Sequence, residues 1–288
     1  MSYKHNFTFT SFIKNEVVFP ENLEQLTKYL KSKHTIIGNL RSYGDTCVGK
    51  NSKHISLKNF NKIINFDKKN ELIEVQSGLM LKDFFNYIVK KNFILECMPG
   101  CKFVTIGGMI ANNIHGKLII DNSLSKKIVS IKLIGNNYKI IECSRNKNKK
   151  LFDLTIGGKG LTGPILSAKI RVTKLPSKTI YQETYYFDSK RSFIKYLKEL
   201  KKFKYSVTWL NFTKKNFEGM ILCGKYIKKK KYSNSGDFNL PKILIYLISL
   251  ISTNKLFIKF FNFIFKNKNF FLPKKFIALN DYFFPQNK

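Results

Sequence analysis

The sequence contains few arginines and few acidic residues. Only four of its 52 basic residues are arginines, so 48 are lysines, against 18 aspartates and glutamates and a formal net charge of +34. Selection for phosphate or base recognition favours arginine, whose planar guanidinium makes bidentate contacts that a lysine cannot make. A lysine surplus along the whole chain, together with many Asn, Ile and Phe residues, indicates AT-rich codon usage before it indicates a polyanion partner. We therefore expect no specific nucleic acid.

Cysteines are also few and show no pairing pattern. Cys47, Cys97, Cys101, Cys143 and Cys223 form an odd, scattered set, which is typical of a reducing compartment and not of a disulfide scaffold. No second Cys or His pair lies at ligand spacing from Cys97 and Cys101. We therefore expect no metal site.

The chain has neither a signal-peptide core nor a long apolar run. Its N-terminus, MSYKHNFTFTSFIKNEVVF, is interrupted by polar residues every two or three positions. The apolar clusters 245–251 and 256–265 are far shorter than the roughly 20 residues of a membrane span. They predict either buried core helices or a basic, aromatic amphipathic surface that rests on a membrane or receives a lipid-like substrate. We expect a cytoplasmic location, with peripheral contact at the inner membrane face as an option.

Two common nucleotide-binding motifs are missing. Residues 158–163, GKGLTG, have the letters GxGxxG, but they lead into the expected strand at 165–172 and not into a helix as the Rossmann motif does, and no GxxxxGK[ST] segment occurs, which disfavours ordinary NAD or NTP binding. The 43% hydrophobic and 15% aromatic content excludes a disordered chain. A length of 288 residues suits one large or two modest domains.

Hydrophobic periodicity predicts mixed helices and strands, with a domain boundary at Pro176. For the first half we expect a helix over 21–33, strands at 35–37, 54–57 and 71–75, a helix over 80–91, a hairpin of 128–134 with 138–141, a solvated loop at 145–150, and a strand at 165–172. For the second half we expect strands near 180–187 and 205–211, a helix near 191–202, and a polar loop carrying the lysines 228–231.

Three segments combine glycines with polar residues. They are GNLRSYGD at 38–45, MPGCKFVTIGGMIANNIHGK at 98–117 and GGKGLTG at 157–163. The first can turn backbone N–H groups toward a phosphate, or it can be a tight turn capped by Asp45. The glycine-rich second and third segments suit a backbone lying against a flat ligand, and a bulged turn explains the third equally well. His115 is either a structural histidine or a site residue.

The order and spacing of these motifs resemble the FAD-linked oxidases of the vanillyl-alcohol oxidase type, and most of all the decaprenylphosphoryl-ribose 2-oxidase group. That group shows RSYGD, PGT…VTVGGAIA…DIHGK and GG.GLTG in the same order. The resemblance covers most of residues 20–175 and continues more faintly at 205–209 and 282–285. It implies an α+β protein: a PCMH-type FAD-binding domain of two α/β subdomains over residues 1–175, followed by an incomplete α+β substrate, or cap, domain over residues 176–288.

The resemblance also implies roles for the motif residues. In that family the first segment wraps the FAD pyrophosphate, the second runs along the ribityl chain and the isoalloxazine, and the third packs on the flavin domain. The implied cofactor-binding residues are Gly38, Asn39, Leu40, Arg41, Ser42, Tyr43, Gly44, Asp45, Gly100, Cys101, Thr105, Ile106, Gly107, Gly108, Asn112, Asn113, Ile114, His115 and Ile165. His115 and Lys117 would face the substrate as catalytic residues, and Lys117 and Trp209 would bind it. Some relatives attach FAD through a histidine where Arg41 stands, so non-covalent FAD is expected.

The implied activity is FAD-dependent oxidation of a sugar hydroxyl. The substrate would be the 2-hydroxyl of a polyprenyl-phosphate-linked ribose, as half of an epimerisation to arabinose for cell-wall polysaccharide, with a reductase that acts on the keto sugar as partner. Two alternatives stay open. One is an aldonolactone or alditol oxidase with a soluble substrate, and the other is an inactive fragment that acts as a basic binding module.

The sequence departs from the family pattern at several places. Leu40 stands for a glycine, Cys101 for a threonine, and the apolar run 118–120 for a polar NHH run. Family members are also substantially longer than 288 residues. We therefore expect a fragment, one half of a split protein or a degenerate copy.

Overall fold

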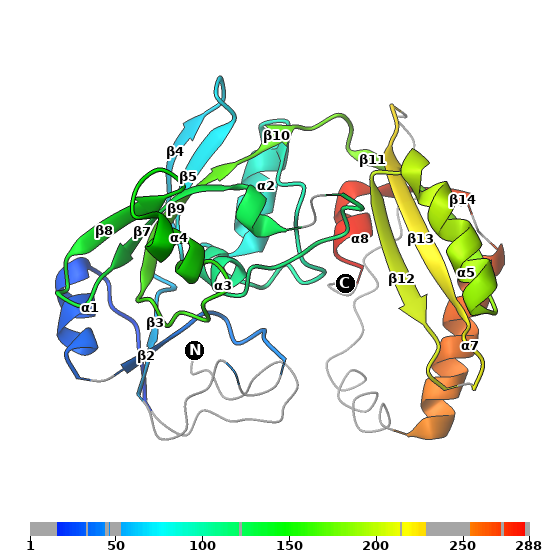
Figure 1. Ribbon diagram of the computed structural model, residues 1–288, viewed down its shortest axis with the longest axis horizontal. Helices are drawn as coiled ribbons and strands as arrows, with labels where there is room; N and C mark the ends of the chain where they lie inside the picture. Colours follow the sequence, from blue (N-terminus) through cyan, green and yellow to red (C-terminus); the bar gives the residue numbers. More distant parts are fainter. Residues whose placement is uncertain are drawn as a thin grey trace. The chain divides into compact units, whose positions relative to one another are not determined.

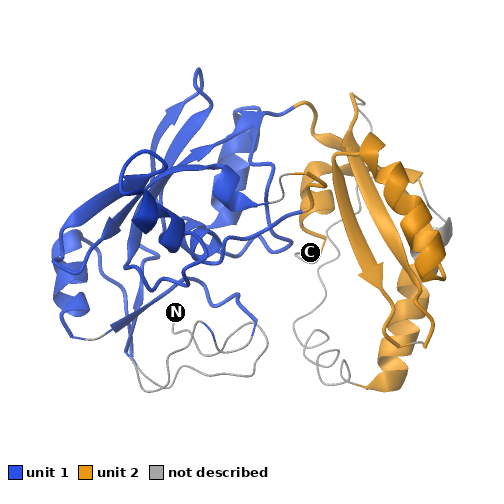
Figure 2. Ribbon diagram, in the orientation of Figure 1, with its two compact units in different colours: residues 1–116, 123–175 blue, residues 117–122, 176–288 orange. Residues whose placement is uncertain are grey.

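The computed structural model describes residues 16–32, 34–43, 46, 53–120, 123–213, 215–228, 254–271 and 274–285. The chain forms two compact units (Figure 2). The first unit comprises residues 1–116 and 123–175, and the second comprises residues 117–122 and 176–288. Both units combine helices with β-sheets, which confirms the α+β class.

The first unit is built on two main sheets, each with its own helices (Figure 1). Its elements are β1 (Val17–Val18), α1 (Leu23–Leu30), β2 (His34–Ile37), β3 (Lys53–Ser56), β4 (Ile63–Asp67), β5 (Leu72–Gln76), α2 (Leu81–Lys90), β6 (Phe93–Ile94), α3 (Ile106–Ala111), a 3₁₀ turn (Leu124–Lys126), β7 (Ile128–Ile134), β8 (Ile140–Ser144), α4 (Lys149–Thr155), β9 (Ile165–Arg171) and β10 (Thr173–Lys174).

The smaller sheet of the first unit has the order β1-β3-β2 and is parallel. The amphipathic helix α1 packs on it through Leu26, which is fully buried with Ile55 of β3. Asn22 caps this helix, because its side chain accepts a hydrogen bond from the N–H of Gln25 at 2.9 Å. This confirms the predicted helix and the strand that follows it.

The larger sheet has the order β4-β5-β9-β7-β8, and all its neighbouring strands are antiparallel. Strand β5 alternates in burial, with Ile73 and Val75 fully buried, as a strand with one face on the core must. Its Glu74 faces the other way and binds Lys132 of β7. Two short strands, β6 and β10, form a separate antiparallel pair.

The second unit is a four-stranded antiparallel sheet with the order β12-β13-β11-β14. Its elements are β11 (Thr179–Phe187), α5 (Lys190–Leu197), a 3₁₀ turn (Lys198–Lys202), β12 (Tyr205–Leu210), β13 (Gly219–Tyr226), α7 (Lys255–Phe271), β14 (Lys274–Ala278) and α8 (Leu279–Phe283). Residues 117–119 join the edge of this sheet, since Leu118 forms a bridge with Tyr205 and the N–H of Ile119 donates to the carbonyl of Lys204.

Two sequence predictions are wrong. The expected loop at 145–150 ends early, because α4 begins at Lys149 and buries Phe152, and Lys149 pairs with Asp153 one turn on. The cluster 256–265 is not a buried core helix, because α7 leaves most of its large apolar side chains exposed. The cluster 245–251 and the lysines 229–231 lie outside the described residues.

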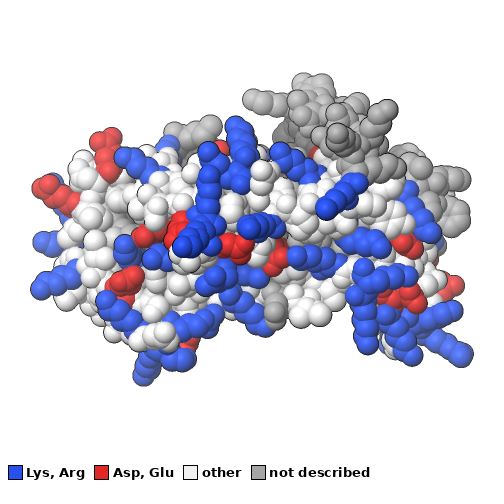
Figure 3. Space-filling view, turned by 90° about the horizontal axis from the view of Figure 1, so that it is seen from above, with Lys and Arg blue, Asp and Glu red and all other residues white. Residues whose placement is uncertain are grey.

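None of the helices that the structure describes is both long and apolar enough to cross a membrane. Lys and Arg side chains are scattered over the face seen in Figure 3, with fewer Asp and Glu side chains among them. This face therefore carries its positive charge in a dispersed form.

Candidate cofactor-binding site

The first glycine-rich segment leaves the small sheet at the end of β2. Leu40 is buried and adopts a left-handed conformation, with φ of 51°, which turns the chain sharply. The side-chain amide of Asn39 donates a hydrogen bond to the carbonyl oxygen of Phe103 at 2.7 Å. The first segment is therefore held against the second, although 64 residues separate the two partners.

Gly38 lets this segment approach α3 closely. A Cβ atom at this position would lie 2.8 Å from the hydroxyl oxygen of Thr105, which is closer than real Cβ atoms come to other groups. Thr105 is the N-cap of α3, and its hydroxyl accepts a hydrogen bond from the N–H of Gly108 at 3.2 Å. A larger residue at position 38 would therefore push β2 away from the start of α3.

The first turn of α3 is fastened to the turn that follows β5. The N–H of Gly107 donates to the carbonyl of Ser77 at 2.7 Å, and the N–H of Ile106 donates to that of Leu79 at 2.9 Å. A Cβ atom on Gly107 would lie 2.9 Å from the Cβ of Ser77. These two N–H groups serve the fold, so the glycines contribute close backbone approach rather than hydrogen bonds to a ligand.

Free backbone donors lie in the first segment instead. The N–H groups of residues 39–42 donate no hydrogen bond to any described residue. Consecutive N–H groups around a left-handed residue form a concave nest that binds anions. Of the other predicted residues here, Arg41 and Tyr43 are exposed, Ser42 is half-buried, and Gly44 and Asp45 lie outside the described residues.

The third segment, 157–163, packs on the C-terminal end of α3. The N–H of Gly157 donates to the carbonyl of Ile110, and the N–H of Lys159 donates to that of Ala111, both at 2.9 Å. The Lys159 ammonium group donates to the side-chain oxygen of Asn112 at 2.7 Å. All three glycine-rich segments therefore meet around one short helix.

The chain after α3 is held by Asn113. This residue has φ of 40°, and its side-chain oxygen accepts hydrogen bonds from the hydroxyl of Ser123 at 2.9 Å and the N–H of Ser125 at 3.1 Å. His115 forms an isolated β-bridge with Ser123, and its side chain is exposed. The fold thus presents the His115 imidazole to solvent from a backbone that is fixed on both sides.

Gly100 and Cys101 precede α3 in a more open position. Gly100 is exposed, and a Cβ atom there would meet no atom within 4 Å. Cys101 is a half-buried free thiol. Packing within the described chain therefore does not require glycine at position 100. Among the described residues, no group of His, Cys, Asp and Glu side chains could hold a metal ion.

Lys117 is the most unusual of the predicted site residues. Its ammonium group donates hydrogen bonds to the carbonyl oxygens of Tyr282, at 2.6 Å, and Phe283, at 2.7 Å. It also lies over both aromatic rings, 5.3 and 5.8 Å from their centres. Burial lowers the pKa of Lys117 to about 8. In the second unit this lysine therefore binds the end of α8.

Two further predicted residues are buried or packed within their own units. Ile165 is buried at the first position of β9, next to Leu166, whose carbonyl accepts a hydrogen bond from the N–H of Ser77. Trp209 of β12 packs edge-on against Phe265 of α7, with ring centres 5.6 Å apart. Ile165 thus lies in the strand that binds the turn after β5, which in turn contacts α3. Trp209 contacts α7.

Ser77 is a site residue that sequence reasoning missed. Its hydroxyl is buried and has no hydrogen-bond partner among the described residues. Such a group costs free energy unless a ligand or water binds it, and it lies 3.6 Å from the Cβ position of Gly107. The only signal in the sequence was its place in the segment QSG between a strand and a helix.

Comparison with known proteins agrees with this geometry. Residues 15–144 match the family described as FAD binding domain. A decaprenylphosphoryl-beta-D-ribose oxidase of Mycolicibacterium smegmatis is 32% identical over 143 residues, which are 49% of this chain and 31% of that protein. A D-lactate dehydrogenase of Anaerostipes hadrus is 29% identical over 132 residues, and an L-gulonolactone oxidase of Mus musculus is 25% identical over 117 residues. These two alignments cover 44% and 41% of this chain and 28% and 27% of the relatives.

The first unit therefore resembles an FAD-binding domain. The match to the FAD binding domain family covers residues 15–144, and it indicates FAD as the cofactor. This confirms the resemblance drawn from the motifs, while the chain spans about a third or less of the length of the relatives it matches. The residues present suit this cofactor. The free N–H groups of residues 39–42 fit a pyrophosphate, and the glycines of α3 permit close approach of a flat ligand to the backbone. The buried Ser77 hydroxyl, which has no partner among the described residues, could bond to a polar group of the cofactor.

Proposed function

We propose that this chain binds FAD non-covalently between its three glycine-rich segments and serves in the oxidation of a sugar hydroxyl. The observation that carries the proposal is the meeting of these segments around α3, within a unit that matches an FAD binding domain. The donors of residues 39–42, with the Arg41 guanidinium and the Ser42 hydroxyl, would hold the pyrophosphate. Arg41 cannot form the covalent flavin bond of some relatives.

Oxidation of a carbinol requires a hydride acceptor and a base for the hydroxyl proton. FAD supplies the hydride acceptor when bound. We propose His115 as the base, because its side chain is exposed and its backbone is held by the bridge to Ser123. Lys117 is the second candidate, but its amine would have to leave the carbonyls of Tyr282 and Phe283 to reach a substrate.

For the substrate we propose the 2-hydroxyl of a polyprenyl-phosphate-linked ribose, with a reductase acting on the resulting keto sugar as partner. The name of the Mycolicibacterium smegmatis relative supports this class. The L-gulonolactone oxidase supports the alternative of a soluble sugar lactone. In either case Trp209 would bind the sugar through the free part of its ring, since one side already packs on Phe265.

Flavin binding tests the first part of this proposal. The purified 288-residue chain should show a flavin spectrum, and acid precipitation should release all the flavin into the supernatant. Arg41→Gln should weaken FAD binding roughly tenfold, because charge-assisted bonds to a phosphate are strong. Arg171→Gln is the matched control, since Arg171 is exposed in the same unit and is not part of the three segments. The proposal is overturned if the chain retains no flavin after FAD has been added and the unbound FAD removed.

Anaerobic bleaching of the bound flavin tests the substrate. Reduction by a short polyprenylphosphoryl-ribose, with no response to L-gulonolactone or D-lactate, supports the lipid-linked sugar. Reduction by the lactone alone supports the soluble-substrate alternative. Steeply salt-dependent DNA binding by a chain without flavin would support the basic binding module instead. His115→Asn should bind FAD normally and lower the bleaching rate by roughly a hundredfold.

A further inference from the structure

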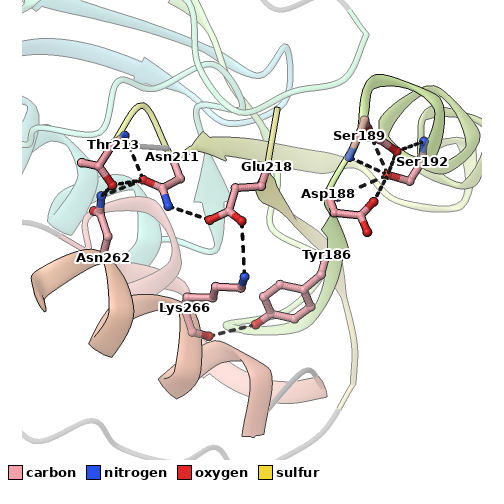
Figure 4. Close-up of polar contacts among 9 residues, drawn as sticks. All are labelled: Tyr186, Asp188, Ser189, Ser192, Asn211, Thr213, Glu218, Asn262 and Lys266. Carbon is pink, nitrogen blue, oxygen red and sulfur yellow. Dashed lines mark hydrogen bonds and ion pairs between the residues drawn. The ribbon is translucent and has the colours of Figure 1, made fainter. Parts of the chain in front are cut away.

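Helix α7 is seated on the second unit by its polar side. The side-chain amide of Asn262 donates a hydrogen bond to the side-chain oxygen of Asn211 at 3.0 Å, and Asn211 in turn donates to Glu218 at 2.6 Å (Figure 4). The ammonium group of Lys266 lies 3.7 Å from Glu218, and its carbonyl oxygen accepts a hydrogen bond from the hydroxyl of Tyr186 at 3.3 Å. These contacts join α7 to three strands of the sheet or their ends.

The outward side of α7 is apolar. Leu256, Phe260, Phe261, Phe263 and Ile264 are between 48% and 75% exposed. Helical residues follow one another at intervals of about 100°, so positions 256, 260, 263 and 264 form one stripe, position 262 lies on the other side of the helix, and position 266 lies between the two. The helix thus carries an apolar stripe that faces water, while Asn262, Lys266 and the ring of Phe265 make its contacts with the sheet.

The charge of this helix has one sign. The sequence from 255 to 271 contains four lysines and no Asp or Glu. Lys255 and Lys259 are exposed. Position 259 lies next to position 263 at the border of the apolar stripe, and position 255 lies further round the helix, on the side of positions 262 and 266. Exposed phenylalanines with exposed lysines on the same helix match an anionic lipid interface, where the rings enter the acyl boundary and the ammonium groups reach the headgroups.

We infer that α7 docks this chain on an anionic membrane surface. The helix is too short and too interrupted by lysine to span a bilayer, and its polar contacts hold it on the sheet (Figure 4). A nucleic acid does not fit, since its phosphates offer no partner to the apolar stripe. The inference concerns only the second unit and does not rest on FAD binding.

Vesicle flotation tests the docking. The chain should bind phosphatidylcholine vesicles that contain about a third phosphatidylglycerol, and binding to pure phosphatidylcholine should be several-fold weaker. The double variant Phe260→Ser with Phe263→Ser should partition to the anionic vesicles roughly tenfold or more weakly, because two exposed rings are lost. Lys255→Gln with Lys259→Gln should weaken binding at low salt and leave little further salt dependence.

A matched control is available on α5 of the same unit. Ile194 and Leu197 are also exposed apolar residues on a helix packed on the sheet. Ile194→Ser with Leu197→Ser should bind anionic vesicles as the unchanged chain does. The single tryptophan, Trp209, reports whether α7 stays seated, because it contacts Phe265. Its emission maximum should be the same in all these proteins.

Each outcome decides the inference. Loss of vesicle binding in the α7 variants alone, with unchanged Trp209 emission, supports it. Equal binding by the α7 and α5 variants overturns it, and so does absence of binding by the unchanged chain. A chain that is dimeric by light scattering, becomes monomeric in the α7 variant and ignores vesicles would assign the stripe to a second copy, which also overturns the lipid inference.

Discussion

Lys117 places its ammonium group 2.6 Å from the carbonyl oxygen of Tyr282, a residue 165 positions further along the chain. The same group donates to the carbonyl of Phe283, and the backbone next to it pairs with the edge of β12 through Leu118 and Tyr205. The lysine at the end of the second glycine-rich segment is thus part of the second unit. Side chain and backbone together fix residues 117–119 there.

Lys117 gives the second unit a specific pH dependence. Its pKa is about 8 in the folded chain, below the ordinary value of 10.5, so the unfolded chain binds more protons between these pH values. Relative to Lys117→Met, the free energy of unfolding should therefore rise between about pH 8 and 10.5, by on the order of 3 kcal/mol. Urea titrations followed by Trp209 fluorescence measure this difference. Parallel pH profiles of the two proteins would contradict it.

Asn39 should contribute to FAD affinity through the loop that it holds. Asn39→Ala removes the 2.7 Å hydrogen bond to Phe103 and should weaken FAD binding about five- to tenfold, since such a bond contributes about 1 kcal/mol. Asn59→Ala is the control, because Asn59 makes a comparable bond to the carbonyl of Phe19 at 3.2 Å in the same unit. Flavin fluorescence titration of both variants gives the comparison. Equal affinities would show that the loop needs no such anchor.

Gly107 and Gly100 should respond differently to alanine. A methyl group at 107 would lie 2.9 Å from the Cβ of Ser77, whereas a methyl group at 100 meets nothing within 4 Å. Gly107→Ala should destabilise the first unit by about 1–3 kcal/mol and weaken FAD binding. Gly100→Ala should change stability by less than about 0.5 kcal/mol. Thermal unfolding followed by circular dichroism tests both, and a neutral Gly107→Ala would refute the close approach.

Glu74 should make the first unit sensitive to acid. Burial alone would raise its pKa, but the hydrogen bond and charge of Lys132 at 2.8 Å lower the pKa below 4.5, with a further hydrogen bond from Ser167. This contribution to stability is complete above the ordinary pKa and is lost as the pH falls through the lowered one.

Glu74→Gln should therefore be less stable than the unchanged chain near neutral pH, and the difference should shrink as the pH falls below the ordinary pKa of 4.5 and through the lowered one. Glu16→Gln is the control, because the pair of Glu16 with Lys53 is exposed and 3.8 Å long. Denaturant unfolding at several pH values measures both. A constant difference for Glu74→Gln across the acid range would contradict the assignment.

Local patterns in the sequence predicted much of the fold. The helix α1 follows from the spacing of Leu23, Leu26 and Leu30, and α2 follows from four apolar residues that are all buried, Leu81, Phe84, Phe85 and Ile88. The strands of the larger sheet show the alternation or apolar runs that a sheet requires. Short elements such as α3 and α4 were not predicted, because six or seven residues carry too little periodicity and their stability comes from tertiary contacts.

The candidate site was only partly predictable. Motif order indicated the three glycine-rich segments, but their meeting around α3 depends on bonds such as that between Lys159 and Asn112, which are 47 residues apart. Ser77 is not part of a recognisable motif, and only the folded structure shows that its hydroxyl is buried without a hydrogen-bond partner among the described residues. Contacts over such separations leave no periodic trace in a sequence.

The sequence by itself indicated the class of the first unit, because the order of its three glycine-rich motifs resembles that of the FAD-linked oxidases. Its few arginines also predict that recognition of nucleic acid is not the reason for the large positive charge. Only the tertiary structure decided what Lys117 and α7 do. The Lys117 ammonium group donates hydrogen bonds to two carbonyl groups far along the chain, and α7 is held by polar contacts that leave Phe260, Phe261 and Phe263 exposed. Both depend on partners that the chain brings together only by folding.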